Sequence, residues 1–216
     1  MEFSKILIIG AGGVGSWLIE EIAACIEQEQ INPNIQFFIA DNDTTEIKQM
    51  LYQNFTKKDL GKNKAKALSI RFKEFGFKAI QSRVEKESHL NGCDVFVLCA
   101  DNNIVRKLVF EYCHKNGKEF IDLRAEGRLV FAMPKSISKE KIEGNWFCIY
   151  HNSYHKVGDY STACKEENTL NKDLETLNLA DKENGSCQLK SDLEKGIIQK
   201  GNKIAAMIGA QMLLNL

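Results

Sequence analysis

Short apolar runs alternate with segments of helical periodicity up to about residue 150. The run at 5–9 ends in four consecutive apolar side chains, and residues 13–28 place apolar side chains at the spacing of a helix. Such runs are typical of strands buried on both faces. Further strands are predicted at 35–40, 78–82, 94–100, 119–123, 128–132 and 146–150. The alternation predicts an α/β fold built on a doubly wound, mostly parallel Rossmann-like sheet.

Helical spacing recurs between these strands and at the end of the chain. A short helical pattern covers 46–52, a longer helix is predicted at 61–75, and another begins after Asp101. In the helix at 61–75 the candidates for the buried face are Ala65, Leu68, Ile70 and Phe72. Apolar residues surround much of the terminal helix, which we expect to be buried.

The character of the chain changes at residue 151. Residues 151–191 are polar and weakly periodic, and a connection of this length predicts a polar loop or lid. We therefore divide the chain into an α/β domain over 1–150, the polar segment, and a C-terminal helix over 192–216 that packs on the same domain.

Glycines follow the first strand at Gly10, Gly12, Gly13 and Gly15. They predict a tight turn between a strand and the start of a helix. Unpaired N–H groups and the helix dipole favour an anion there, and glycine lets the backbone approach a phosphate closely. The motif predicts nucleotide binding in the 1–150 domain, but it fits nicotinamide, flavin and ATP ligands alike.

Aspartates follow two of the predicted strands, where α/β sheets place their ligands. Asp41 ends the strand at 35–40 and suits a ribose hydroxyl, although it could instead be a turn aspartate at the strand end. Asp101 follows the strand at 94–100, and its alternative role is the N-cap of the next helix.

The order of these motifs resembles the ubiquitin-activating enzyme superfamily of the ThiF/MoeB/HesA type. The residues that carry the resemblance are the glycine turn, Asp41-x-Asp43 with Glu46, Gln53, Gly61 to Ala65, and Asp101-Asn102 with Arg106. The resemblance covers residues 5 to about 132 well. It implies an ATP-dependent adenylyltransferase that activates the C-terminal carboxylate of a ubiquitin-like protein or a small peptide. It also implies a homodimer.

The resemblance carries ligand roles to individual positions. Gly12, Gly13 and Gly15 would line the phosphates of ATP and Gly10 would belong to the same nucleotide site, with Asp41 and Asp43 by the ribose and Gln53 near the nucleotide. Lys64 would bind the phosphates, and Asp101 would hold Mg²⁺ at the α-phosphate. Activation brings two anions together, so cations and N–H dipoles are needed where charge develops.

Two of these basic residues have alternative interpretations. Lys64 has several lysine neighbours and could be a solvated helix residue. Arg106 could pair with Asp101 or be solvated.

Cysteines are candidates for a later transfer step. Cys187, near the last helix, resembles a family cysteine that takes part in acyl or sulfur transfer, and Cys164 beside Lys165 is the second candidate. A thiolate would attack an acyl adenylate readily. Both could instead be incidental thiols. The other cysteines lie in apolar or helical patterns and are expected in the core: Cys25, Cys93, Cys99, Cys113 and Cys148.

The chain departs from the family pattern at several places. A family arginine that meets the γ-phosphate falls on Tyr52, for which Lys48 could substitute, and a family asparagine falls on Gln49. The first strand begins within five residues of Met1, where relatives have a helix. These departures leave two other functions open. One is a non-catalytic adenylation-fold scaffold, and the other is an NAD-dependent oxidoreductase.

Composition narrows the class of protein further. The formal net charge of zero disfavours a nucleic-acid surface. No apolar run approaches membrane-spanning length, and no export signal begins the chain. Seven cysteines, an odd number, predict reduced thiols in a cytoplasmic protein. No Cys-x-x-Cys pair supports a zinc site, and His151 and His155 lie in a poor helical context for metal ligands.

Overall fold

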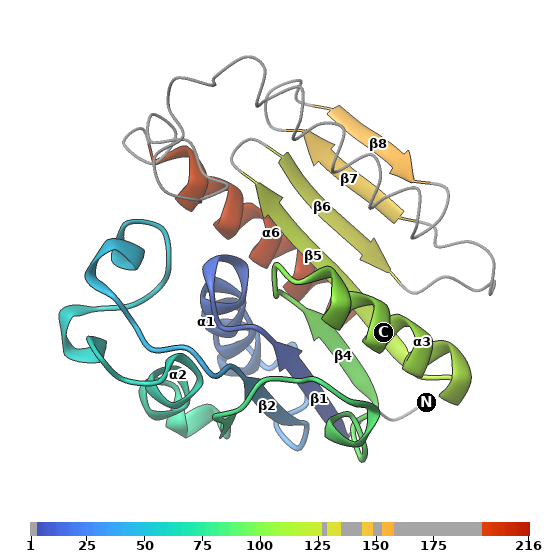
Figure 1. Cartoon of the computed structure of the whole chain (residues 1–216), viewed down its shortest axis with the longest axis horizontal. Helices are drawn as coiled ribbons and strands as arrows, with labels where there is room; N and C mark the ends of the chain where they lie inside the picture. Colours follow the sequence, from blue (N-terminus) through green and yellow to red (C-terminus); the bar gives the residue numbers. More distant parts are fainter. Residues whose placement is uncertain (1–3, 127–128, 135–143, 149–152, 158–195) are drawn as a thin grey trace.

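The computed structural model describes residues 4–126, 129–134, 144–148, 153–157 and 196–216, and it describes side chains for 4–102, 104–125 and 196–216. Within these residues a single eight-stranded sheet runs through the molecule in the order β3-β2-β1-β4-β5-β6-β7-β8 (Figure 1). The strands are β1 (Lys5–Ile9), β2 (Gln36–Ala40), β3 (Lys78–Ile80), β4 (Val95–Leu98), β5 (Glu119–Glu126), β6 (Leu129–Pro134), β7 (Gly144–Cys148) and β8 (Ser153–Val157).

The five strands from β3 to β5 pair in parallel, and their order reverses between β1 and β4. The predicted fold class, a doubly wound and mostly parallel α/β sheet, is therefore confirmed. A reversal of strand order opens a crevice at the carboxyl ends of the two central strands, which is where α/β proteins bind ligands.

The remaining strands pair in antiparallel fashion. Only residues 127–128 separate β5 from β6, and a parallel crossover needs a dozen residues or more. The alternating pattern in the sequence pointed to a parallel arrangement and did not reveal this meander. β8 also lies within 151–191, where the sequence predicted a loop.

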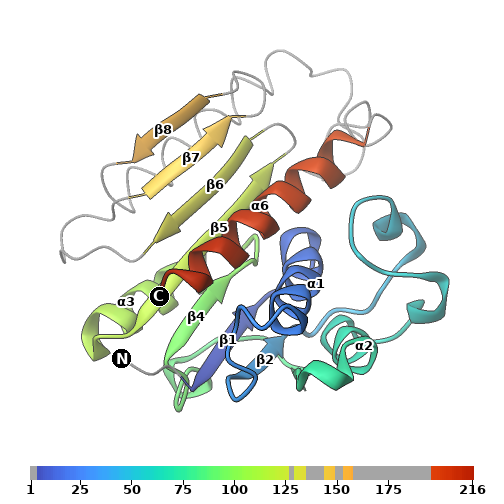
Figure 2. The same ribbon diagram turned by 180° about the vertical axis from the view of Figure 1, so that it is seen from behind.

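Helices cover both faces of the sheet. They are α1 (Gly13–Glu27), α2 (Lys64–Arg71), α3 (Asn103–Asn116) and α6 (Ile197–Leu214). Figures 1 and 2 show α1 and α6 side by side on one face and α3 on the other. The alternation of side chains along β1 divides the core accordingly: Ile6 and Ile8 pack with α1, α2 and α6, whereas Leu7 and Ile9 pack with α3.

Two helices differ from the sequence pattern. The helix expected at 61–75 is α2 followed by a separate 3₁₀ turn (Lys73–Phe75), and Ile70, expected to be buried, is 52% exposed. In α6, Met207 is 57% exposed, so this helix is buried along one side and open along the other. No helix in the described part of the chain has the length and apolar character needed to cross a bilayer.

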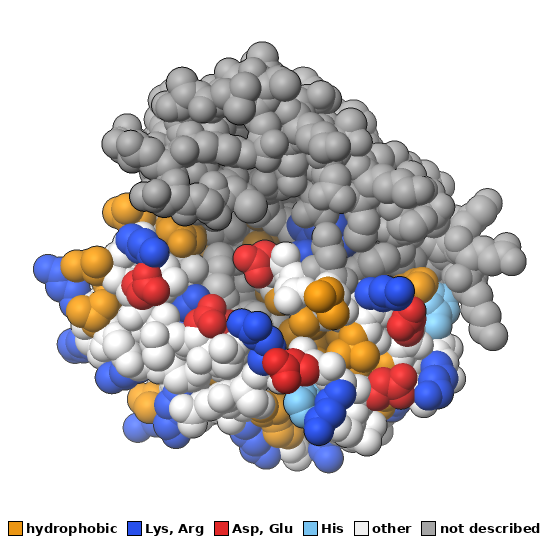
Figure 3. Space-filling model, in the orientation of Figure 1, with side chains coloured by type: hydrophobic (Ala, Val, Ile, Leu, Met, Phe, Trp, Pro, Cys, Tyr) orange, Lys and Arg blue, Asp and Glu red, His pale blue; other side chains and the backbone are white. Residues whose placement is uncertain are grey.

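Charged side chains of both signs are interspersed over the described part of the face in Figure 3. This mixture is the arrangement expected of a chain with no formal net charge.

Candidate functional site

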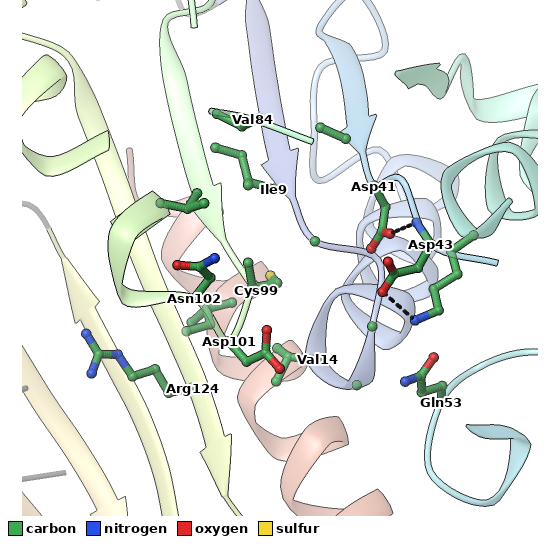
Figure 4. Close-up of a pocket in the computed structure, with 18 of the residues that line it drawn as sticks. Ile9, Val14, Asp41, Asp43, Gln53, Val84, Cys99, Asp101, Asn102 and Arg124 are labelled. Atoms are coloured by element: carbon green, nitrogen blue, oxygen red, sulfur yellow. Dashed lines mark hydrogen bonds and ion pairs between the residues drawn. The ribbon is translucent and has the colours of Figure 1, made fainter. Parts of the chain in front are cut away.

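A pocket of about 480 Å³ opens at the carboxyl ends of β1, β2 and β4, where the strand order reverses. It is lined by the glycine turn, the ends of these strands, α2, the start of α3, and residues of β5 and α6 (Figure 4). The sequence-predicted residues that line it are Gly10, Gly12, Gly13, Asp41, Asp43, Gln53, Lys64 and Asp101.

The glycine turn requires glycine at two positions for steric reasons. Gly10 has a φ of +97°, and a Cβ there would lie 2.8 Å from the Ala100 nitrogen. A Cβ on Gly15 would overlap the Gly10 carbonyl oxygen. Gly12 precedes α1 and provides no side-chain cap. The first N–H groups of α1 therefore begin beside the pocket without a side-chain oxygen that competes for them.

Asp41 connects the glycine turn to the loop after β2. Its carboxylate accepts hydrogen bonds from the Ala11 N–H at 2.7 Å and from the Asp43 N–H at 2.8 Å. Burial raises the pKa of Asp41, and these bonds oppose that shift. The turn role weighed for this residue is thus present in the structure. Its ribose role stays a prediction.

Lys64 is buried, at 4% exposure, although four lysines flank it in the sequence. The neighbouring Asn63 caps α2 by accepting the Lys66 N–H at 2.9 Å. This cap directs Lys64 inward, where its Nζ lies 3.4 Å from the Asp43 carboxylate. The interpretation of Lys64 as a solvated helix lysine is therefore wrong. The structure places a cation at the wall of the pocket, as phosphate binding would need.

Gln53 is 6% exposed, and its Oε1 has no hydrogen-bond partner among the described residues. Buried amide oxygens are nearly always paired, so a lone one that lines a pocket suits a donor on a ligand. The peptide that follows is fixed to α1, because the Asn54 N–H donates to Ser16 Oγ at 2.9 Å.

Asp101 is exposed within the pocket. The N-cap of α3 is Asn102, whose side chain accepts the Ile104 N–H at 2.8 Å. The alternative interpretation of Asp101 as a cap is therefore wrong, and its carboxylate is not used to cap α3. No cluster of three or more His, Cys, Asp or Glu side chains suited to a metal occurs in the described residues. Mg²⁺ commonly uses one or two carboxylates with substrate phosphates, which Asp101 fits.

Two buried arginines form ion pairs with one buried carboxylate of β5. Arg106 Nε lies 3.0 Å from one Asp122 oxygen, and Arg124 contacts the other at 2.8 Å. Burial works to raise the pKa of Asp122, but the two guanidinium groups hold it below its ordinary value. The sequence suggested that Arg106 either pairs with Asp101 or is solvated. Both interpretations are wrong, because Arg106 is buried and pairs with Asp122. Figure 4 shows Arg124 on the opposite side of Asp101 from Asp43 and Gln53, with its guanidinium directed away from Asp101.

The structure describes the side chains of four cysteines that were expected in the core. Cys93 and Cys113 are buried, and Cys25 and Cys99 are partly buried, as expected for packing residues. Burial raises the pKa of the Cys99 thiol, so it is a poor nucleophile although it lines the pocket. Cys164 and Cys187 lie outside the described residues, and the side chain of Cys148 is not among those described.

Some lining residues were not singled out by the sequence analysis. These are Arg83, Arg124 and Asn202. A signal for Arg124 existed, since Asp122-x-Arg124 places two opposite charges on the same face of a strand whose intervening and preceding residues, Leu123, Ile121 and Phe120, are apolar. Lys48, considered as a substitute for the missing arginine, is exposed, pairs with Glu46 at 3.0 Å, and is not among the described residues that line the pocket.

Comparison with known proteins identifies relatives of the whole chain. The ThiF family model matches residues 1–214. Among curated proteins, none matches the chain. The fold is similar to that of E. coli MccB solved with AMPCPP and MccA, with a TM-score of 0.63 and 18% identity over 98% of this chain and 55% of MccB.

Other solved structures have a similar fold. E. coli MccB with ATP matches at a TM-score of 0.62 and 18% identity, covering 98% of this chain and 55% of that one. PaaA matches at a TM-score of 0.60 and 14% identity, covering 98% of this chain and 55% of PaaA. These likenesses show a shared fold. The chain spans about half the length of the structures it matches.

Proposed function

Because the chain belongs to the ThiF family, we propose that it is an ATP-dependent adenylyltransferase that activates the C-terminal carboxylate of a peptide or ubiquitin-like protein. The observation that carries this proposal is one pocket in which the glycine turn and the buried Lys64 meet the Gln53 Oε1, an oxygen with no hydrogen-bond partner in the described part of the chain. Together they suit a phosphorylated ligand with hydrogen-bond donors.

The chemistry explains why these groups belong together. A carboxylate oxygen of the substrate bonds to the α-phosphorus of ATP, and the bond to pyrophosphate breaks, leaving an acyl adenylate. Two anions must approach each other, so positive charge and N–H dipoles lower the barrier. Lys64 and the first N–H groups of α1, which border the same pocket as Asp101, would supply these. Mg²⁺, held by Asp101 and phosphate oxygens, would neutralise further charge when bound.

The solved relatives favour a peptide substrate. MccB has been crystallised with ATP, and also with AMPCPP together with MccA. We therefore give a small peptide with a free C-terminus priority over a ubiquitin-like protein. The proposal includes a homodimer, whose test is sedimentation of the purified chain.

Transfer of the activated acyl group to a thiol is the second step of the proposal. The Cys187 thiolate would attack the acyl carbonyl, forming a thioester and releasing AMP, with Cys164 as the second candidate. Intact-mass spectrometry after incubation with ATP and a substrate peptide should detect an adduct that Cys187→Ser abolishes. An adduct that survives Cys187→Ser and disappears in Cys164→Ser would transfer the role to Cys164.

ATP–pyrophosphate exchange in the presence of synthetic peptides with free C-termini tests the adenylation step. Lys64→Met should reduce exchange by roughly 100-fold, because a buried cation facing the phosphates is lost. Lys66→Met, two positions along α2 and exposed, is the matched control and should retain activity within about twofold.

Two outcomes would favour other functions. Tight binding of NADH with no affinity for Mg–ATP would indicate an oxidoreductase. Binding of Mg–ATP without exchange, in the presence of a peptide proven to bind, would indicate a scaffold. Tyr52 at the position of the family arginine is the specific observation that favours the scaffold.

A further inference from the structure

One polar side chain of the C-terminal helix is buried beside the pocket. Asn202 is 2% exposed. The other buried residues of α6 are small or apolar: Ile198, Gly201, Ala205, Ala206, Gly209 and Ala210. Burying an amide is unfavourable unless it is hydrogen-bonded. Asn202 meets this condition, because its Nδ2 donates to the Tyr52 carbonyl at 3.0 Å.

Asn202 also packs directly on the glycine turn. A Cβ on Gly13 would lie 2.7 Å from Asn202 Nδ2 and 2.9 Å from its Oδ1. Any other residue at position 13 would therefore require the Asn202 amide to shift. The same side chain thus touches the glycine turn and the peptide that carries Gln53.

The segment from Tyr52 to Asn54 is held from two directions. From α1, Trp17 Nε1 donates to the Tyr52 carbonyl at 3.1 Å, and Ser16 Oγ accepts the Asn54 N–H at 2.9 Å. From α6, Asn202 donates to the same Tyr52 carbonyl. Gln53 lies between these anchors, with its buried Oε1 unpartnered among the described residues.

We propose that Asn202 is a positioning residue, which holds the Tyr52–Gln53 peptide against the glycine turn and so directs the Gln53 amide toward the ligand. α6 then contributes to nucleotide affinity without supplying a ligand group of its own. The effect on nucleotide affinity rests on the proposed function. The effect on the peptide itself does not, since all of its contacts lie within the protein.

Two variants of Asn202 and one control separate positioning from general stability. Asn202→Leu keeps the approximate volume but cannot donate, and Asn202→Ala serves if leucine does not fit beside Gly13. The control is Lys200→Met, because Lys200 is an exposed residue of α6 two positions before Asn202. Each protein is measured twice: by hydrogen exchange of the ligand-free chain, and by calorimetric titration with Mg–AMPPNP.

We expect faster exchange of the amides of residues 52–55 in Asn202→Leu or Asn202→Ala, together with roughly five- to tenfold weaker binding of Mg–AMPPNP. Lys200→Met should change neither value by more than about twofold. Unchanged exchange at 52–55 would overturn the proposal, and weaker binding in that case would indicate that Asn202 contacts the nucleotide itself. Faster exchange with unchanged affinity would also overturn it. If the unaltered chain bound no nucleotide, the proposed function would fail, while the exchange data would still decide whether Asn202 holds the peptide.

Discussion

Asp122 of β5 provides the negative charge that two buried arginines share. Its carboxylate is fully buried and contacts Arg106 and Arg124. Removing one partner of a buried ion pair leaves an uncompensated charge, which costs far more than loss of a surface pair. Both guanidinium groups would lose their shared anion in an Asp122→Asn variant.

We expect Asp122→Asn to lower the free energy of unfolding by about 3–5 kcal/mol, measured by urea denaturation. The control is Lys107→Gln, which breaks the exposed Lys107–Glu111 pair of α3 and should cost no more than about 0.5 kcal/mol. Equal stabilities of the two variants would contradict a structural role for the buried pair.

Asp94 makes the stability of the chain depend on pH. Burial works to raise its pKa, but hydrogen bonds from the Ser4 and Lys5 N–H groups and from Lys118 lower it to about 2. A carboxyl with a depressed folded-state pKa stabilises the protein above its unfolded value, near 3.9, and loses that contribution as the pH falls toward 2.

Asp94→Asn should therefore reduce stability at pH 7 and matter progressively less as the pH is lowered from 4 to 2. Because this site is largely solvated, we expect roughly 1 kcal/mol at pH 7. Urea denaturation of both proteins at several pH values measures the difference. A constant difference across this range would show that Asp94 acts through packing or hydrogen-bond geometry and not through its charge.

At the scale of the elements, α6 packs on β5 through a glycine, Gly209. A Cβ on Gly209 would overlap Leu123 of β5, and Leu18 of α1 lies on the other side of the same space at 3.3 Å. Gly209→Ala should therefore destabilise the protein by about 1–3 kcal/mol, because the helix must move away from the sheet. Thermal denaturation measures this, with Met207→Ala on the exposed side of the same helix as the control. A stabilised Gly209→Ala variant would show that Leu123 can rotate away without cost.

The sequence predicts these elements well where the signal is local. The run Val95–Leu98 could only be a buried strand, and the Gly61–Ala65 motif distinguished Lys64 from its lysine neighbours. The direction of β6 was not predictable in the same way. A connection of two residues forces β6 to run antiparallel to β5, but the length of this connection depends on where the two strands end, and the sequence does not define those ends well. Ile70 was misplaced because it lies about 200° around α2 from Leu68, so the helix that buries Ala65 and Leu68 turns Ile70 toward solvent.

At the scale of the whole molecule, long-range contacts decide what the sequence alone could not. Asn202 and Tyr52 are 150 positions apart, and no periodicity links them. Arg106 and Asp122 meet only because α3 packs back on β5. The glycine turn and the acidic strand ends were predictable, since parallel strands bring their carboxyl ends to one edge. The residues that β5 and α6 bring to the pocket, such as Arg124 and Asn202, could be identified only from the three-dimensional structure.

Ligand binding should stabilise the entire fold, because the pocket joins both halves of the parallel sheet. At 100 times its dissociation constant, Mg–ATP should add about 2.7 kcal/mol to the stability of the native state. A clear rise in melting temperature with Mg–ATP, and none with NADH at equal concentration, is the expected result of a thermal shift assay. A rise in melting temperature with NADH and none with Mg–ATP would contradict the proposal that ATP is the substrate.

The close fit between Gly13 and Asn202 limits how this protein can be recombined with its relatives. A chimera that received the opening strand and turn from another family member, but retained the native last helix, would keep this fit only where the donor also has a glycine at the position of Gly13. The two ends of the chain should therefore be exchanged together in engineering, as one matched set. Libraries that vary position 13 and position 202 independently would consist mostly of mismatched pairs.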